Sequence, residues 1–411
     1  MEKVLIIGAV WVEPNSSAAG SRMLQLIKLF IEDNYEVTFA TTTQKTTNAF
    51  NLTALGVIEV SIELNSSSFD DFVKELNPSI VVFDRFMIEE QFGWRVADHC
   101  PNALRILDTE DLHSLRKCRE EAVKRLTPFS SDHLLTSDIA KREIAAILRC
   151  DVSLIISSFE MQLLQNVFNI DKKLLFHLPF LFKPIEQNQI TDWKPFQQRN
   201  HFITIGNFLH APNVDAVLYL KNEIWPLIKD KVPNAEMHIY GAYPTHQILQ
   251  LHNQQERFLI KGFVQDAEKV VSEAKVLLAP LRFGAGIKGK LSEAMLCGTP
   301  SVTSQVGAEG MHLELPWNGF IDDEISAFVE KSIELYSDSE IWKKAQQNGV
   351  EIINQLYNKS KLTPLFIFHV TQLKHNLSKH RKDNFLGSLL QYQTMRSTKY
   401  MSKWIEEKNK S

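Results

Sequence analysis

The stretch Val276–Ser304 reads VLLAPLRFGAGIKGKLSEAMLCGTPSVTS and predicts a strand, a glycine-bearing loop, a helix and a second strand. The apolar run Val276–Pro280 is typical of a buried strand, and Ser301–Thr303 has the same character. The helix between them should begin near Lys290 and end at Gly298, because glycine is favoured just past the last helical residue. This order aims a helix N-terminus and bare backbone N–H groups at one point, which suits an anion such as a phosphate.

Glycines and cations crowd the loop of this stretch. Gly284, Gly286 and Gly289 leave the backbone accessible, while Lys288 and Lys290 add positive charge. The order of these glycines, and their place deep in the second half of the chain, differ from the dinucleotide-binding fingerprint. Glycines alone also fit a simple tight turn between strand and helix. Because two lysines and a carboxylate one turn into the helix accompany them, a nucleotide-diphosphate site is the better interpretation.

Apolar strands alternate with helical patterns on both sides of this stretch. Helical apolar spacing is seen in Arg22–Ile31, Phe69–Leu76 and Val214–Ile228. Alternation of this kind implies parallel sheets joined by right-handed crossovers, and two such sets predict two Rossmann-like α/β domains. Parallel sheets bind ligands at the carboxyl ends of their strands, so the active site should lie in the cleft between the domains. The expected strands are Val4–Gly8, Glu36–Ala40, Ile80–Phe83, Leu104–Leu107, Val152–Ile156, Phe202–Gly206, Glu236–Tyr240, Phe258–Lys261, Val276–Ala279 and Ser301–Thr303.

Breaks in the periodicity divide the chain into four parts. Residues 1–183 form the first domain, and residues 184–200 form a linker in which prolines and a run of Gln and Asn interrupt the pattern. Residues 201–364 form the second domain. Residues 365–411 have helical spacing and mixed charge, which predicts a helical tail.

Composition narrows the class of protein. The chain has 411 residues, 44% of them hydrophobic, and a net charge of −4 with acids and bases interspersed, which argues against bulk electrostatic binding of nucleic acid. No apolar stretch approaches the ~20 residues that a membrane span requires, and the apolar start of the chain is too short for a signal peptide. We therefore expect a soluble, cytoplasmic protein. The four cysteines have neither metal-ligand nor disulfide spacing: Cys100, Cys118, Cys150 and Cys297.

The segment Gly284–Gly298, followed by Gly307-Ala308-Glu309-Gly310, resembles the donor-binding segment of a known family of enzymes. The family is that of the retaining, nucleotide-sugar-dependent glycosyltransferases of the GT-B fold, specifically the large group called family 4 or glycosyl transferases group 1. The resemblance runs from Lys3 to about Tyr357. It implies two Rossmann-like domains whose parallel sheets face one another across a cleft. The first domain would receive the acceptor, the second would bind the donor, and the tail would pack back on the first.

This resemblance also implies an activity. A hexosyl group would pass from a nucleotide-diphosphate sugar to a saccharide, lipid-linked or other acceptor, with retention of anomeric configuration, as in polysaccharide biosynthesis. Neither a metal nor another cofactor is expected, because lysines and a helix N-terminus neutralise the leaving group in such enzymes. Two alternatives stay open: another GT-B enzyme, such as a nucleotide-sugar epimerase or a phosphorylase, and a non-catalytic protein that binds nucleotide sugars.

One position departs from the family's pattern. Many members have two glutamates with seven residues between them; here Glu293 takes the second place, but Ala285 takes the first. The leading glutamate usually contacts the sugar, so the identity of the donor sugar stays open. Glu293 should accept hydrogen bonds from the ribose hydroxyls, and its alternative partner is Lys290 on the same helix face.

Sugar transfer requires that negative charge be stabilised as the diphosphate leaves. The suppliers expected are the catalytic lysines Lys288 and Lys290 and the donor-binding backbone of Gly284, Ala285, Gly286 and Ile287. A solvated side chain is the alternative for each lysine. Further donor contacts are expected from residues that follow other strands of the second domain, namely Gly307, Glu309, His210 and Phe263. Phe263 also fits a core aromatic position, and His210 also fits a residue that only shapes a turn.

The first domain should supply the opposite wall of the cleft. By resemblance, the loop Pro14–Arg22 faces the donor, with Gly20 and Arg22 as contacts. The alternative for Arg22 is a position on the protein surface, and the alternative for Ser21 is a helix cap.

Polar residues are densest in Leu107–His113, at the carboxyl end of an expected strand. The resemblance implies that a histidine from this region lies near the sugar, so His113 is the candidate, with Asp108 and Asp111 as alternatives. The three neighbouring carboxylates should pair with arginines or have raised pKa values. Such a cluster also suits a divalent metal, but GT-B enzymes generally require none.

Two features point to the acceptor side. Asp84-Arg85 follows a strand and predicts a contact with the acceptor. The helix expected after His113 concentrates positive charge beside an apolar stripe, and such a helix can rest on an anionic membrane. A stripe that faces the core below a solvated charged face is the alternative. The basic positions are Arg116, Lys117, Arg119, Lys124 and Arg125, and the apolar ones are Leu112, Leu115, Ala122 and Leu126.

Overall fold

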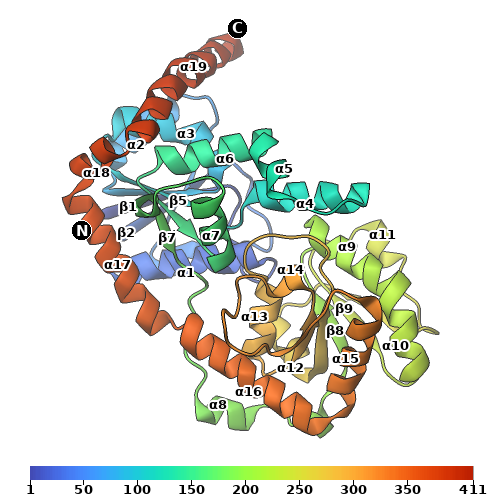
Figure 1. The fold of residues 1–411 in the computed structure, drawn as a ribbon. Coiled ribbons are helices and arrows are strands. Elements are labelled where there is room, and N and C mark those ends of the chain that lie inside the picture. The colour runs from blue at the N-terminus through green and yellow to red at the C-terminus, as the bar shows by residue number, and fades with distance from the viewer. Residues whose placement is uncertain (411) are drawn as a thin grey trace.

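The computed structural model describes residues 1–410, which form two parallel sheets flanked by helices (Figure 1). The first sheet has seven strands in the order β3-β2-β1-β4-β5-β6-β7, and the second has six in the order β10-β9-β8-β11-β12-β13. The strands of the first sheet are β1 (Lys3–Gly8), β2 (Glu36–Thr41), β3 (Ile58–Ser61), β4 (Ile80–Asp84), β5 (Leu104–Asp108), β6 (Val152–Ile155) and β7 (Leu175–His177). Those of the second are β8 (Asn200–Ile205), β9 (Met237–Tyr240), β10 (Phe258–Gly262), β11 (Ala274–Ala279), β12 (Ser301–Thr303) and β13 (Gly319–Ile321).

Helices connect the strands and cover both sheets. The first domain contains α1 (Ala18–Glu32), α2 (Ser68–Leu76), α3 (Phe86–His99), α4 (His113–Arg125), α5 (Ser131–Thr136), α6 (Asp138–Arg149) and α7 (Ser158–Asn166). After α8 (Gln187–Asp192), the second domain contains α9 (Ala211–Tyr219), α10 (Trp225–Lys231), α11 (His246–Leu249), α12 (Ala267–Glu273), α13 (Gly289–Leu296), α14 (Gln305–Ala308), α15 (Ile325–Ser337) and α16 (Ser339–Leu356). The tail consists of α17 (Lys359–His375), α18 (Leu377–Asp383) and α19 (Phe385–Lys410).

Strand β1 illustrates why both faces of the first sheet are covered. Val4 and Ile6 point to one face, Leu5 and Ile7 point to the other, and none of the four is exposed. Continuous apolar runs of this kind are typical of parallel strands buried on both sides. Helices α1 and α17 pack on one face, and helices such as α3, α6 and α7 pack on the other. The prediction of two α/β domains is confirmed.

The expected elements match the structure closely in the interior of each sheet. All ten strands expected from the sequence are present, with ends within two residues of the expected positions. The three strands that the sequence analysis missed, β3, β7 and β13, each form an edge of a sheet. Helix α13 begins at Gly289, and Gly298 has the left-handed conformation (φ 61°) that glycine favours just past a helix.

The chain crosses between the domains twice, and the two crossings lie side by side. Phe182 on the outward crossing and Asn358 on the return form a parallel bridge. The amide of Phe182 donates to the carbonyl of Tyr357, and the amide of Lys359 donates to the carbonyl of Phe182, both at 2.8 Å. The return therefore lies at Tyr357–Lys359, somewhat before residue 365, where the sequence suggests the tail to begin.

The tail packs along the first domain. Phe366 of α17 contacts Phe30 of α1 edge-on, with ring centroids 6.0 Å apart. Helix α19 packs against α3 and α6 and then extends past them, as Figure 1 shows at the end of the chain. The tail thus ties the end of the chain to the domain in which the chain begins.

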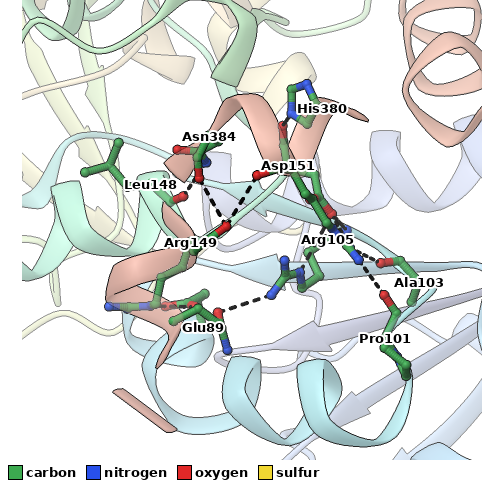
Figure 2. A network of polar contacts seen from close by, with 12 residues as sticks. Glu89, Pro101, Ala103, Arg105, Leu148, Arg149, Asp151, His380 and Asn384 are labelled. Atoms are coloured by element: carbon green, nitrogen blue, oxygen red, sulfur yellow. Dashed lines mark hydrogen bonds and ion pairs between the residues drawn. The ribbon is translucent and has the colours of Figure 1, made fainter. Parts of the chain in front are cut away.

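A polar network fixes α18 to the amino ends of β5 and β6 (Figure 2). Arg381 donates at 2.7 Å to each carboxylate oxygen of Asp151 and to the carbonyl of Ala103. His380 contacts the carbonyl of Asp151 at 2.7 Å, and Asn384 donates to the carbonyl of Leu148 at 2.8 Å. Because Ala103 and Asp151 directly precede their strands, α18 lies at the opposite end of the sheet from the strand carboxyl ends.

Candidate functional site

A cavity of about 880 Å³ lies between the two domains, at the carboxyl ends of their strands. From the first domain it is lined by the loop between β1 and α1 and by residues just after β4 and β5. From the second it is lined by residues that follow β8 and β10 and by the loop between β11 and α13. We call this cavity the cleft. Its position at the facing carboxyl ends matches the position expected from the strand alternation.

The N-terminus of α13 points into the cleft. Lys288 occupies the N-cap position without a side-chain hydrogen bond to the helix, and the first amides of α13 have no acceptor within the helix. A Cβ on Gly289 would lie 2.5 Å from the Cβ of Ala18, the first residue of α1. Glycine therefore allows the N-termini of α1 and α13 to meet across the cleft. Two helix dipoles thus direct partial positive charge toward the same space.

Lys288 and Lys290 are held by neutral oxygens rather than by carboxylates. The Lys288 ammonium donates to the carbonyl of Gly286, and that of Lys290 donates to the side-chain oxygen of Asn213, both at 2.8 Å. Burial lowers the pKa of each lysine to about 8. Both are mostly charged at pH 7 and lie in the cleft lining, so an anion in the cleft would find two cations.

Glu293 lines the cleft one turn into α13. Burial, reinforced by the carboxylates of Glu268 and Asp266, raises its pKa to about 7, although Lys290 opposes this shift. Among residues 1–410 its carboxylate makes neither a hydrogen bond nor an ion pair within the protein. It is therefore an acceptor available to a bound hydroxyl group.

Phe263 follows β10 and lines the same side of the cleft as Glu293. Its side chain is 42% exposed, so the core-aromatic alternative does not describe it. The preceding residue, Gly262, has φ 77°, a left-handed conformation that favours glycine and turns the chain just before Phe263. An exposed aromatic face in a cleft is a surface for stacking on a flat ring.

A histidine and carboxylate cluster lines the first-domain wall. Asp111 accepts a hydrogen bond from Arg116 at 2.8 Å and lies 3.3 Å from the Nε2 atom of His113. Burial opposes ionisation of Asp111, but Arg116 and His113 outweigh it and lower the pKa of Asp111. Burial lowers the pKa of His113 to about 4 and that of His210, across the cleft, also to about 4. Both imidazoles are therefore neutral at pH 7 and able to exchange hydrogen bonds with a neutral sugar.

Arg22 and Asp108 are placed elsewhere. Arg22 donates from Nε and Nη2 to one oxygen of Asp108, at 2.9 and 2.7 Å, and from Nη1 to the carbonyl of Leu178 at 2.8 Å. Both side chains are at most 1% exposed, and neither lines the cleft. The expectations that Arg22 contacts the donor and that Asp108 takes part in the chemistry do not fit this placement. The pair instead ties α1 to β5 in the interior.

Three further candidates do not line the cleft. A Cβ on Gly20 would lie 2.2 Å from the carbonyl oxygen of Glu13, and one on Gly307 would lie 1.9 Å from the hydroxyl of Thr303. Both glycines are therefore required by close packing. Glu309 accepts two hydrogen bonds from Arg119, at 2.7 and 2.8 Å, so it bridges the domains instead of facing a ligand. Their expected donor contacts are not supported by this geometry.

Residues 199–338 match a protein-family model described as "Glycosyl transferases group 1". Comparison with curated protein sequences gives no match of significance. Solved structures of the same fold cover nearly the whole chain.

This chain has the GT-B fold and carries a group 1 glycosyltransferase domain. One similar structure is a sucrose-phosphate synthase from Thermosynechococcus elongatus, with 14% identity, a TM-score of 0.65 and coverage of 91% of this chain and 99% of that one. A variant of S. aureus TarM, in complex with fondaparinux, alpha-GlcNAc-glycerol and UDP, has 12% identity, a TM-score of 0.67 and coverage of 90% and 99%. Anabaena HepE, in complex with UDP and glucose, has 14% identity, a TM-score of 0.61 and coverage of 90% and 100%. The prediction of the GT-B fold is confirmed.

Glu160 of α7 contacts the loop between β11 and α13, and the sequence analysis did not single it out. Its Oε1 atom accepts from the amide of Gly286 at 2.8 Å and from the amide of Leu112 at 3.0 Å. Burial raises the pKa of Glu160 to about 8. A carboxyl group of the first domain therefore holds the loop between β11 and α13 of the second domain at Gly286. The contact joins positions 126 residues apart, so no local pattern announces it.

Arg85 and Glu110 also line the cleft, and both have positive φ angles, 73° and 61°. Such backbone conformations are uncommon for residues with a side chain and concentrate at functional sites. Burial, followed by the charge of Asp108, raises the pKa of Glu110 well above its ordinary value. Among residues 1–410, the Oε1 atom of Glu110 has no hydrogen-bond partner. The carboxylate cluster around Asp111 is thus partly paired with arginine and partly of raised pKa, as its crowding suggests.

The apolar residues predicted for the α4 region divide between core and surface. Leu112, Leu115 and Ala122 are buried, as in the core-facing alternative, whereas Leu126, just past the end of α4, is 90% exposed. Each basic residue has an acidic partner: Arg116 with Asp111, Lys117 and Lys124 with Glu120, Arg119 with Glu309, and Arg125 with Glu121. Within residues 1–410, no helix is long and apolar enough to cross a membrane. In the same part of the chain, no group of three or more His, Cys, Asp or Glu residues is arranged to hold a metal ion.

Proposed function

We propose that this glycosyltransferase transfers a hexosyl group from a nucleotide-diphosphate sugar to a saccharide or lipid-linked acceptor, with retention of anomeric configuration. The observation that carries the proposal is the N-terminus of α13, with Lys288, Lys290 and Glu293, at the wall of an interdomain cleft. The complexes of TarM and HepE with UDP support a nucleotide donor. Retention and the family 4 assignment rest on the resemblance of Gly284–Gly298.

The donor's diphosphate is proposed to bind at the start of α13. Its oxygens would accept hydrogen bonds from the first amides of the helix, where the dipole favours negative charge. Lys288 and Lys290 would exchange their present acceptors, the Gly286 carbonyl and the Asn213 side chain, for phosphate oxygens. These acceptors are neutral, so the lysines lose no ion pair when they turn toward the phosphates. The exchange therefore favours the bound diphosphate.

The nucleoside is proposed to lie along Glu293 and Phe263. The ribose hydroxyls would donate to the carboxylate of Glu293, which has no partner among the described residues. The base would stack on the exposed ring of Phe263. This arrangement would direct the anomeric carbon toward the space between His113 of the first domain and His210 of the second, both of which line the cleft. Ala285, in the place of the family's first glutamate, leaves the sugar contact to other groups.

The transfer breaks the bond between the anomeric carbon and the diphosphate oxygen and forms a bond to an acceptor hydroxyl oxygen, whose proton leaves with the diphosphate. Charge develops on the departing diphosphate, and two lysines with a helix N-terminus would stabilise it in a water-poor cleft. We propose that these groups suffice without a metal or another cofactor. His113 and His210, neutral at pH 7, would orient the sugar hydroxyls, and Arg85 would contact the acceptor.

The proposal is tested with a panel of nucleotide-diphosphate sugars. Thermal shift identifies the donors that bind, and slow release of nucleoside diphosphate in their presence supports transfer. NMR of the anomeric proton of the product then reports retention or inversion. Binding without release would instead indicate a non-catalytic nucleotide-sugar-binding protein, the alternative that Ala285 raises. Recovery of an isomerised nucleotide sugar would indicate an epimerase.

A further inference from the structure

Helix α19 presents an apolar face to solvent. Seven of its large apolar side chains are exposed: Phe385, Leu386, Leu389, Tyr392, Tyr400, Met401 and Trp404. We call this set the α19 outer face. Phe385, Tyr400 and Trp404 are 72%, 67% and 60% exposed. Large aromatic side chains clustered along one solvent-facing side of a helix indicate an interaction surface, whereas single exposed apolar residues do not.

The opposite side of α19 is polar and holds the helix to the first domain. Ser402 is 3% exposed and accepts a hydrogen bond from Arg95 at 3.0 Å. Lys399 pairs with Asp98 at 2.6 Å. A Cβ on Gly387 would lie 2.0 Å from a backbone carbonyl oxygen of α6. Gly387 lies two residues after Phe385, and Ser402 lies two residues after Tyr400. Two residues are about half a helical turn. Polar anchors thus lie on the side that faces the first domain, and exposed aromatic residues lie on the other side.

Positive charge accompanies this face. Residues 359–411 contain eleven Lys and Arg against three Asp and Glu, a net charge of +8. The whole chain has a net charge of −4, so the rest of it carries −12. Four of the basic residues pair with acids of the first domain, Lys359, Lys374, Arg381 and Lys399. Within the described residues, the exposed Lys361, Lys379 and Lys382 form no ion pair, and Lys403 is also exposed, with its charge acting on Asp98.

We propose that the α19 outer face, with the lysines of α18 and α19 around it, docks the enzyme on the surface of an anionic lipid bilayer. Trp and Tyr favour the level of the lipid headgroups, where a ring lies in the apolar layer and its polar atom meets water. Lysines beside them meet anionic headgroups while their stems cover apolar surface. A second copy of the chain is a poorer occupant, because the basic residues of the two tails that are not paired with the first domain would repel one another.

Docking of this kind leaves the cleft accessible. The tail contacts residues at the amino ends of β5 and β6, whereas the cleft lies at the carboxyl ends. The α19 outer face shares no residue with the cleft lining. Loss of membrane docking should therefore leave donor hydrolysis in solution unchanged. This separates a failure of the docking proposal from a failure of the proposed function.

Co-sedimentation with vesicles tests the proposal. The full-length protein should bind vesicles made of both phosphatidylglycerol and phosphatidylcholine. It should bind far less to vesicles of phosphatidylcholine alone. Binding should weaken as salt is raised. The triple variant Phe385→Ser, Tyr400→Ser, Trp404→Ser should lose at least about tenfold in partition coefficient, because three large apolar side chains no longer enter the interface. Reversal of exposed charge in Lys382→Glu, Lys403→Glu should also reduce binding to the anionic vesicles.

A matched control removes exposed apolar residues elsewhere: Leu126→Ser, Leu227→Ser, Leu249→Ser. It should bind anionic vesicles as the wild type does. Circular dichroism and thermal unfolding check that each variant is folded. If the triple variant is unfolded, the Lys382→Glu, Lys403→Glu variant still tests the proposal. Absence of binding to anionic vesicles, or equal binding by wild type and both α19 variants, overturns the proposal. A wild-type dimer in sedimentation velocity that the triple variant converts to a monomer also overturns it, in favour of a second copy.

Discussion

Burial gives several side chains in or beside the cleft pKa values near neutrality. Burial lowers the pKa of Lys288 and Lys290 to about 8, and it raises the pKa of Glu293 to about 7. The charge of the donor site therefore changes within the physiological range of pH. In the open solvent these same groups would be fully ionised at pH 7. A nucleoside diphosphate, which itself carries negative charge, should sense these changes in its affinity.

Lysine removal should affect the chemical step more than binding. If Lys288 and Lys290 stabilise the leaving diphosphate, Lys288→Met and Lys290→Met should lower kcat by about 100-fold and change KM much less, because the developing charge is the main beneficiary. Steady-state release of nucleoside diphosphate measures both constants. Normal turnover in both single variants and in the double variant would show that the charge is stabilised elsewhere, with His210 next to be examined.

Affinity for a nucleoside diphosphate should have a maximum between about pH 7 and pH 8. Below about pH 7, Glu293 takes up a proton and becomes a weaker acceptor for the ribose hydroxyls; above about pH 8, the two lysines lose charge. Glu293→Gln should cost about 2 kcal/mol of binding free energy at pH 7.5 and abolish the acid limb while keeping the basic limb. Isothermal titration calorimetry across pH measures this. An acid limb that persists in the variant would assign it to another group.

Glu160 should make the protein less stable as pH rises. Burial raises its pKa to about 8 in the folded protein, so the folded state holds a proton that the unfolded chain has released above about pH 4. Stability therefore falls between these two values as pH rises. Glu160→Gln keeps an oxygen acceptor for the amides of Gly286 and Leu112 but cannot ionise. Thermal unfolding from pH 5 to pH 9 should fall less steeply in the variant; parallel curves would show that Glu160 ionises normally.

At the scale of elements, the meeting of α1 and α13 depends on small residues at both N-termini. A Cβ on Gly289 would lie 2.5 Å from that of Ala18, closer than packed atoms approach. Gly289→Ala should therefore separate the two helices and lower kcat/KM by about tenfold, since a small misplacement of a catalytic wall is costly.

The swapped pair provides the control for this prediction. Ala18→Gly removes the opposing Cβ, so the double variant Ala18→Gly, Gly289→Ala should recover most of the lost activity. Ala18→Gly alone should cost little, because it creates space without a clash. A double variant no better than Gly289→Ala would show that the added methyl acts on α13 itself and not across the cleft.

Interior strands were predictable from the sequence because their apolar runs leave few alternatives. Strands such as β1 and β4 each contain four consecutive apolar residues buried on both faces, which periodicity detects. The missed strands are short edge strands; β3, for example, has four residues and none of them is buried. Half-exposed runs of that length resemble loops, and only pairing with a neighbouring strand defines them.

The candidate site was predictable only where its residues are close in sequence. The donor loop and α13 form one contiguous segment, so the sequence brought Lys288, Lys290 and Glu293 together. Arg22 and Asp108 lie 86 positions apart, and their buried pairing removes both from the cleft. Glu160 reaches Gly286 across the domain boundary. Such contacts are set by how the two domains pack, which strand and helix periodicity does not encode.

At the scale of the whole molecule, polar contacts hold the two domains together around the cleft. Arg119 of the first domain donates hydrogen bonds to the carboxylate of Glu309 and to the carbonyl of Gly284 in the second domain. On another side of the cleft, the hydroxyl of Tyr243 donates to Glu13 at 2.8 Å. The tail adds a different tie, since it passes from the second domain onto the first and ends in the network around Asp151 (Figure 2). The first domain therefore depends on residues from both ends of the chain.

The last prediction compares two ion pairs between the tail and the first domain. Arg381 pairs with Asp151, whose side chain is 2% exposed, whereas Lys374 pairs with Glu2, which is 55% exposed. Arg381→Met should cost about 2–3 kcal/mol, because it leaves a buried carboxylate with only the more distant Arg105 and one amide as partners. Lys374→Met should cost less than about 1 kcal/mol, because water solvates the released carboxylate. Thermal unfolding of the two variants at pH 7 measures the difference.

Lowering the pH should remove the stability that Arg381 provides through its pair with Asp151. Burial opposes the charge on Asp151, but Arg381 and Arg105 outweigh it and lower its pKa. The resulting stability is present above the unfolded pKa of about 4 and is lost as pH falls through the folded value. The gap in unfolding temperature between Arg381→Met and the wild type should therefore be largest near pH 7 and shrink in acid. Equal losses for Arg381→Met and Lys374→Met at pH 7 would mean that the buried pair contributes no more than the exposed one.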